Sequence, residues 1–115
     1  MRQDGKIDYV EFPATDLPAV KQFYAAAFGW SFLDYGPTYA AIDPSAGLDG
    51  GFDASPESQL AKPLVILYAS DLEAMKAKVK ASGGTISVPI FAFPGGRRFH
   101  FRDPAGNELA VWSET

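Results

Sequence analysis

The chain contains no cysteine and only one histidine, which excludes several kinds of reactive site. Without cysteine there is no disulfide, no thiolate nucleophile and no thiolate metal site. No apolar run approaches the ~20 residues that a helix needs to cross a bilayer, and Met1 to Lys6 has no apolar signal core. The formal net charge is −4 and lysine and arginine form no block, which argues against nucleic acid. We therefore expect a cytoplasmic protein with no membrane or nucleic-acid partner.

What the chain does have is aromatic side chains, with nine Phe, five Tyr and two Trp among 115 residues. This length fits one domain, and a hydrophobic content of 47% is ordinary for a globular protein. The aromatic residues would suit either a Phe-rich core or an aromatic-lined pocket, and composition alone does not choose between the two.

An internal repeat indicates the architecture. The segment Ala14 to Leu17 recurs 55 residues later as Ala69 to Leu72, and Gly29 recurs at the same offset as Gly84. Each copy therefore runs from an aspartate that can cap a helix, through an amphipathic helix, to a glycine that can end it.

Period-2 patterns and turn residues add four strands to each copy. The first copy has predicted strands at Lys6 to Ala14, Trp30 to Tyr35, Thr38 to Asp43 and Gly50 to Ala54. The second has them at Pro63 to Ala69, Thr85 to Phe93, Arg97 to Arg102 and Glu108 to Ser113. A polar stretch, Asp53 to Lys62, links the copies.

The prediction is thus an α+β fold with one domain over residues 1–115. It consists of two βαβββ modules, at about 6–55 and 62–114, whose strands form a curved mixed sheet with one helix per module. The helices cover one face of the sheet. The other face forms a cup that must meet a ligand or a second unit.

At this point the chain resembles the vicinal oxygen chelate superfamily, the glyoxalase, bleomycin-resistance and extradiol-dioxygenase group. The resemblance covers nearly the whole chain. It rests on Ile7 to Val10 leading to Thr15 to Leu17, on Phe28 to Trp30, on Ser70 to Leu72, and above all on the turn Phe101 to Asn107. Members of this family include lyases, isomerases, epimerases, dioxygenases and drug binders, so the resemblance predicts the fold more sharply than the function.

The resemblance also implies where a metal would bind, and the chain departs from the family there. Family enzymes hold one divalent ion with His, Gln and Glu side chains in the cup. The corresponding positions here are Tyr9, Leu64, Ala110 and, by internal symmetry, Gly50 or Gly51. Leucine, alanine and glycine side chains cannot donate to a metal, and neutral tyrosine is a poor ligand. We therefore expect no metal and no other cofactor.

Strand alternation extends the set of cup residues from these positions. If Tyr9, Leu64 and Ala110 face the cup, other residues of the same parity do so too. The expected ligand-binding residues are Tyr9, Glu11, Leu64, Ile66, Arg98, His100, Ala110 and Trp112. Trp112 could stack on a planar ligand, whereas for Trp30 we favour packing in the core or at a dimer interface.

Glu11 and His100 are the candidate catalytic residues. His100 could act as an acid or base near neutral pH, or it is a strand histidine that packs its ring and bonds locally. Glu11 could be a general base or accept a ligand hydrogen bond, or it pairs with Arg98 or a neighbour. Neither choice is settled by the sequence.

We therefore expect a metal-free protein that binds an apolar or aromatic small molecule in the cup, and expect it to be a homodimer. Two alternatives belong to other classes. One is a metal-dependent glyoxalase-like lyase or dioxygenase, and the other is a metal-free acid–base enzyme that uses Glu11 and His100.

Overall fold

The computed structural model describes residues 2–56 and 61–115. The chain divides into two compact units. The first unit consists of residues 9–64, and the second combines residues 1–8 with 65–115. The predicted linker, Asp53 to Lys62, lies partly outside the described residues, at 57–60.

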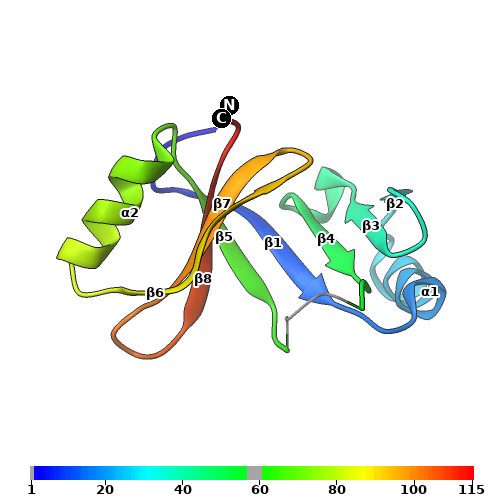
Figure 1. Cartoon of the computed structure of the whole chain (residues 1–115). Helices are drawn as coiled ribbons and strands as arrows, with labels where there is room; N and C mark the ends of the chain where they lie inside the picture. The colour runs from blue at the N-terminus through cyan, green and yellow to red at the C-terminus, as the bar shows by residue number, and fades with distance from the viewer. Residues whose placement is uncertain (1, 57–60) are drawn as a thin grey trace. The chain divides into compact units, whose positions relative to one another are not determined.

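The first unit has four strands, in the order β2-β3-β4-β1, and one α-helix (Figure 1). These elements are β1 (Ile7–Pro13), which begins in the second unit, α1 (Leu17–Phe28), β2 (Phe32–Asp34), β3 (Tyr39–Ile42) and β4 (Gly50–Asp53), with a short 3-10 turn at Pro44–Ala46. β1 pairs with β4 in parallel, and the other pairs are antiparallel. The core lies between α1 and the sheet, where Leu17 packs with Ile42 and Phe52.

The predicted helix signals are confirmed in the first unit. The side chain of Asp16 accepts a hydrogen bond from the backbone N–H of Ala19, at 3.1 Å. Gly29 ends α1 in the left-handed conformation, with φ of 75°. Because the N–H of Trp30 still bonds to Tyr24 O, Trp30 belongs to the helix end, and β2 starts at Phe32, two residues later than predicted. The Trp30 ring stacks on Tyr24 in the core, as expected.

The second unit repeats this plan, with strand order β5-β8-β7-β6 (Figure 1). Its elements are β5 (Leu64–Tyr68), α2 (Leu72–Ala81), β6 (Thr85–Phe93), β7 (Gly96–Arg102) and β8 (Glu108–Ser113). β5 pairs with β8 in parallel, and β7 pairs with both its neighbours in antiparallel orientation. α2 packs against β6, β7 and β8, and its core contacts centre on Leu72, Phe99 and Val111.

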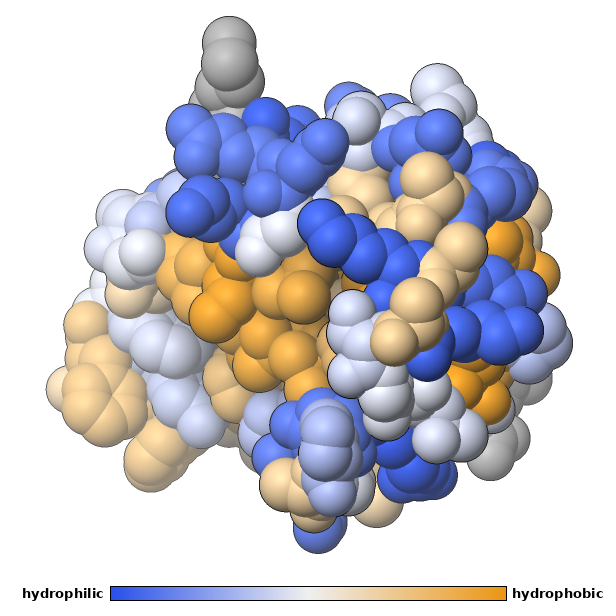
Figure 2. Space-filling model, turned by 90° about the vertical axis from the view of Figure 1, so that its left-hand side faces the viewer, coloured by the Kyte–Doolittle hydropathy of each residue, from blue (hydrophilic) through white to orange (hydrophobic). Residues whose placement is uncertain are grey.

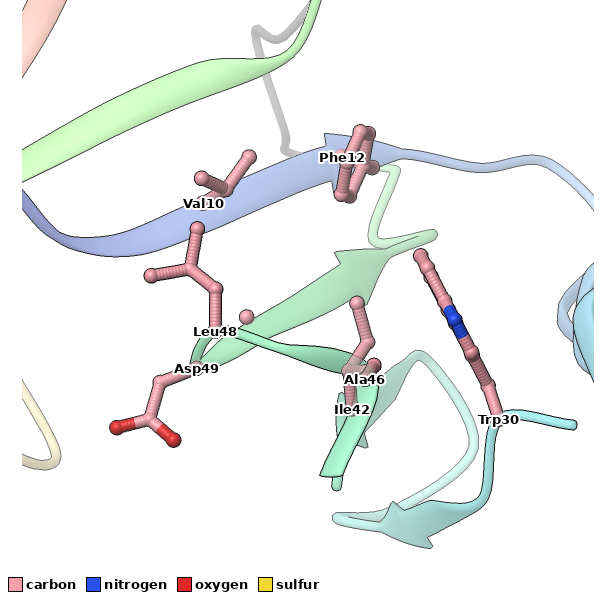
Figure 3. A pocket seen from close by; sticks show the side chains of 8 residues that line it. Val10, Phe12, Trp30, Ile42, Ala46, Leu48 and Asp49 are labelled. Carbon is pink, nitrogen blue, oxygen red and sulfur yellow. The ribbon is translucent and has the colours of Figure 1, made fainter. Parts of the chain in front are cut away.

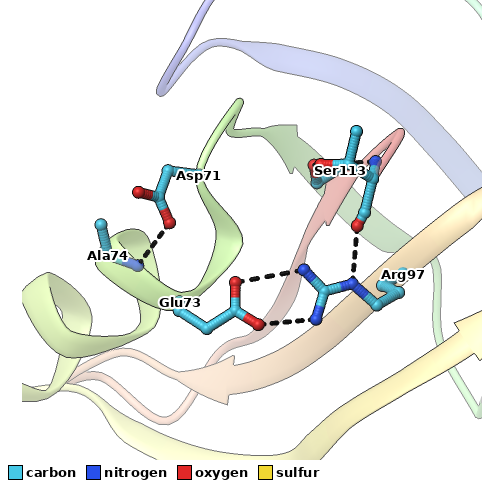
Figure 4. A network of polar contacts seen from close by, with 6 residues as sticks. Asp71, Glu73, Ala74, Arg97 and Ser113 are labelled. Carbon is cyan, nitrogen blue, oxygen red and sulfur yellow. Dashed lines mark hydrogen bonds and ion pairs between the residues drawn. The ribbon is translucent and has the colours of Figure 1, made fainter.

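Two polar contacts fix the start of α2 (Figure 4). The side chain of Asp71 accepts from the N–H of Ala74, at 3.0 Å. Arg97, on β7, donates to both carboxylate oxygens of Glu73, at 2.6 and 3.1 Å. The α2 helix ends at Ala81 with Ser82 as its C-cap, and Gly83 follows with φ of 104°.

The observed elements confirm an α+β fold with two βαβββ modules, each a mixed four-stranded sheet with one helix. Among the described residues, neither α-helix has the length and apolar character of a membrane span.

Candidate functional site

In each unit the sheet face opposite the helix carries the side chains that parity assigned to the cup. We call it the helix-free face. In the first unit Phe12 packs into the core beside α1, so its neighbours of opposite parity, Tyr9 and Glu11, lie on the helix-free face. Tyr39 of β3 and Gly51 of β4 lie there too, because Tyr39 contacts both Tyr9 and Glu11, and Gly51 pairs with Glu11.

Tyr9, Tyr39 and Glu11 form a chain of hydrogen bonds on this face. The hydroxyls of Tyr9 and Tyr39 are in short contact, and the Tyr39 hydroxyl donates to Oε2 of Glu11, at 3.2 Å. Glu11 is buried, with 6% of its surface exposed. Burial, more than the nearby carboxylate, raises the pKa of both phenols, so both stay protonated.

Gly51 makes room for this chain of hydroxyls. A Cβ atom at Gly51 would lie 2.2 Å from the Tyr39 hydroxyl oxygen and 2.6 Å from that of Tyr9. The space above Gly51 is therefore filled by the two tyrosine hydroxyls rather than by a side chain of its own.

In the second unit the alternation of β7 and β8 defines the helix-free face. Phe99 and Val111 are buried beneath α2, so Arg98, His100 and Trp112 point to the opposite side. Ala110 pairs with both His100 and Ile66 on that side. Parity thus placed five predicted ligand-binding residues of this unit on one face, as expected from the sequence.

His100 is held on this face by a carboxylate. Its Nδ1 lies 3.3 Å from Oε2 of Glu108, and the same oxygen accepts from the Ser87 hydroxyl, at 2.9 Å. His100 is 8% exposed. Burial lowers the pKa of the imidazole, the charge of Arg98 lowers it further, and Glu108 offsets only part of this effect.

Beside His100 lies a strip of aromatic rings and a guanidinium group. The ring of Phe91 is 5.9 Å from that of His100, and Phe93 is 6.1 Å from Trp112, centre to centre. The Arg98 guanidinium lies over Phe91 and Phe93, at 5.4 and 5.7 Å from their ring centres. Its neighbour Arg97 does not belong to this strip, because it forms an ion pair with Glu73.

Trp112 is less open than strand parity alone suggested. Its indole N–H donates to Oδ2 of Asp8, at 2.9 Å, and the Arg2 guanidinium lies 4.9 Å from the ring centre. The N-terminal segment of the second unit therefore covers part of the ring. Leu64, Ile66 and Ala110 are also buried, at 2%, 4% and 0% exposure.

The residues at the metal positions implied by the family resemblance do not fit a metal. Leu64 and Ala110 are buried apolar side chains, and the Gly51 position is closed by the Tyr9 and Tyr39 hydroxyls. Tyr9 is protonated and already bonded to Tyr39. Within residues 2–56 and 61–115, no three His, Cys, Asp or Glu side chains come together as a possible metal site.

A hollow lies on the other side of the first unit, where the sheet meets the helix end (Figure 3). It has an empty volume of about 440 Å³, including space open to solvent. Its lining is apolar apart from Asp49, whose carboxylate turns away from Phe12 and Trp30. The lining residues are Val10, Phe12, Trp30, Ile42, Ala46, Leu48, Asp49 and Gly50.

The sequence did not predict that Tyr39 and Ser87 belong to the helix-free faces, nor that Glu108 pairs with His100. Tyr39 lay in a predicted strand, but its partners depend on the β1–β4–β3 register, which the sequence does not reveal. Glu108 shares strand parity with Ala110, and its sequence distance of eight residues from His100 suits a hairpin pair. Ser87 lies where the pairing register of β6 shifts, and the sequence pattern did not predict that shift.

Comparison with known proteins agrees with the architecture. The sequence profile of the "Glyoxalase/Bleomycin resistance protein/Dioxygenase superfamily" matches residues 6–111. The "Putative glyoxylase CFP32" of Mycobacterium tuberculosis is 28% identical over 120 residues, which cover 96% of this chain and 46% of that protein. The same protein from Mycobacterium bovis matches equally. The chain therefore spans about half the length of these curated relatives.

Solved structures show the same fold at low sequence identity. The methylmalonyl-CoA epimerase of Mycobacterium tuberculosis has a TM-score of 0.72 at 13% identity, covering 97% of this chain and 89% of that one. A Mn(II)-bound glyoxalase from Novosphingobium aromaticivorans has a TM-score of 0.66 at 23% identity, covering 99% of this chain and 40% of that one. With the family profile matching nearly the whole chain, this protein belongs to the glyoxalase/bleomycin resistance/dioxygenase group, the vicinal oxygen chelate superfamily.

Proposed function

We propose that this chain is a metal-free binding protein for an apolar or aromatic small molecule, which it holds on the helix-free face of the second unit. The observation that carries the proposal is the occupancy of the family's metal positions by Leu64, Ala110 and Gly51, with the Gly51 position filled by tyrosine hydroxyls. The strip of Phe91, Phe93 and Trp112 supplies the aromatic surface.

The first test is metal content. We expect elemental analysis of protein purified without chelator to find no stoichiometric zinc, nickel, manganese or iron. A ligand that binds only the folded state raises its stability, so these ions, added one at a time, should leave the melting temperature unchanged. One tightly held ion per chain would refute the proposal.

The second test is binding. In Trp30→Phe protein, Trp112 is the only indole, so its fluorescence reports on the second unit. We expect saturable quenching by 2-naphthol, weakened by Phe91→Ala because that change removes a ring beside His100. Phe23→Ala, at an exposed ring of the first unit, is the matched control and should leave the affinity unchanged.

The acid–base enzyme is the second candidate, favoured by the buried carboxylate of Glu11 in contact with the Tyr39 hydroxyl. Methylmalonyl-CoA is a suitable probe, because methylmalonyl-CoA epimerases share the fold. An enzyme of this kind would exchange the acidic C–H of the probe with solvent deuterium, and Glu11→Gln would slow exchange by roughly 10²–10⁴-fold. Absence of exchange under saturating probe would count against this candidate and leave the binding proposal standing.

A further inference from the structure

One nitrogen of the only imidazole has no visible purpose in the fold. His100 is buried, with 8% of its surface exposed, and its Nδ1 faces Glu108. Nε2 is also buried, and it has no hydrogen-bond partner in the part of the chain that the structure describes. Buried polar atoms are nearly always paired, so an unpaired one calls for an explanation.

The partner of Nδ1 determines what Nε2 can do. A carboxylate accepts hydrogen bonds and donates none when it is ionised, and a neutral imidazole has one donor and one acceptor nitrogen. Because Glu108 accepts, Nδ1 carries the proton and Nε2 presents a lone pair. The Ser87 hydroxyl donates to the same Glu108 oxygen, at 2.9 Å, and so holds that oxygen in place as the acceptor for Nδ1.

The surroundings of His100 keep the ring neutral and give it an aromatic neighbour. The charged groups that act on it are Arg98, on its own strand, and Glu108, on β8. On β6, the contacts are the Phe91 ring and, through Glu108, the Ser87 hydroxyl. Phe91 is 37% exposed and the Glu108 side chain is 34% exposed, so both sides of this environment reach solvent.

We infer that Nε2 of His100 accepts a hydrogen bond from the ligand, and that Glu108 is the positioning residue that keeps this lone pair available. The inference rests on the proposed binding function and deepens it. It names the ligand class: an aromatic small molecule that carries a hydroxyl or N–H donor, with its ring beside Phe91. A molecule of the same shape without the donor leaves the buried nitrogen unpaired and binds more weakly.

The free protein provides the first measurement. Since the chain has one histidine, the ¹⁵N resonances of a labelled imidazole belong to His100 without assignment. We expect them to report the Nδ1–H tautomer at pH 7.5. The Nε2–H tautomer would overturn the inference directly, whatever the ligand.

The second measurement compares two probes, 2-naphthol and 2-methoxynaphthalene, which differ in the donor. We expect 2-naphthol to bind roughly tenfold tighter, as one buried hydrogen bond allows, and to shift the Nε2 resonance. Equal affinities would overturn the inference while leaving the binding function intact, and this is the result if Nε2 only holds a buried water. If neither probe binds, the proposed function fails and the inference fails with it.

The Glu108→Gln variant separates positioning from bulk packing. An amide can donate to Nδ1, which moves the imidazole proton to Nε2 and turns that nitrogen into a donor. We expect the preference for 2-naphthol over its methyl ether to disappear and the tautomer signal to reverse. Glu114→Gln makes the same charge change at the exposed end of the chain and should alter neither reading. An unchanged preference in Glu108→Gln would show that Glu108 does not position the ring.

Discussion

Gly50 and Gly51 are neighbours in β4, yet an added methyl group meets different obstacles at the two positions. At Gly50 a Cβ atom would lie 2.6 Å from the backbone oxygen of Val10. At Gly51 it would meet the hydroxyls of Tyr9 and Tyr39, which are the ends of side chains that can turn away. The first obstacle is fixed and the second can move.

We therefore predict that Gly50→Ala destabilises the protein more than Gly51→Ala does. The first should cost about 3 kcal/mol, since the β1–β4 pairing must open. The second should cost about 1–2 kcal/mol, which is the loss of the hydroxyl contacts. Urea unfolding measures both. In a Tyr39→Ala background the cost of Gly51→Ala should shrink, and an unchanged cost would show that the hydroxyls are not the obstacle.

His100 makes stability depend on pH. Its pKa is lowered in the folded state, so below the unfolded value of about 6.5 the unfolded chain binds the proton more readily. Above about pH 6.5 His100 makes its full contribution to the unfolding free energy. That contribution is lost as the pH drops toward the pKa of His100 in the folded state. We predict that the unfolding free energy of the wild type declines from pH 7.5 to 5.5 more steeply than that of His100→Phe. Parallel pH profiles would contradict the burial of a neutral imidazole.

Which face a residue occupies could be predicted at this scale, whereas its partners could not. Alternation from Tyr9 and Ala110 correctly placed Glu11 and His100 on the faces opposite the helices. Their strand neighbours Phe12 and Phe99 pack against the helices instead. The bonds to Tyr39 and Glu108 depend on cross-strand register, which loop conformations set.

Among the elements, the two helices were the most predictable. Asp16 and Asp71 both cap through a side-chain oxygen, to Ala19 and Ala74 at 3.1 and 3.0 Å. Their signals are local, so no long-range information is needed. The start of β2 was missed because the C-terminal cap of α1 extends to Trp30, where an aromatic residue also fits a strand pattern.

Loss of either cap should have a similar effect. We predict that Asp16→Ala and Asp71→Ala each lower the unfolding free energy by about 1 kcal/mol, measured by urea titration. Asp34→Ala is the control, since its exposed contact with Lys21 is worth little. If a cap variant loses no more unfolding free energy than Asp34→Ala does, the helix is stabilised by packing alone.

For the whole molecule, exposed apolar residues favour self-association. In the first unit Phe23, Phe28, Leu33 and Tyr35 are 58–64% exposed. In the second unit Phe91 is 37% exposed. The surface on the α2 side of the Figure 1 view also carries an apolar area bordered by polar side chains (Figure 2). Apolar surface rimmed by polar residues is typical of interaction sites.

We propose a homodimer that buries more than ~1,000 Å². Sedimentation equilibrium at micromolar concentration should give twice the chain mass of 12.4 kDa. Phe28→Lys and Phe91→Lys should identify the contact, because only the change within the interface weakens association. A wild-type protein that remains monomeric at high micromolar concentration would rule the dimer out.

The second unit takes its first strand segment from the opposite end of the sequence. Gly5 and Lys6 bond to the backbone of Tyr68, Asp4 to Ser70, and Asp8 to Trp112. At a synthesis rate of about 5–20 residues per second, Trp112 is made about 5–20 s after Asp8. Helix α1 and the hairpins need no such delay, since their contacts are local. The contact between Asp8 and Trp112 therefore forms late in folding, in a step that closes a loop of 104 residues.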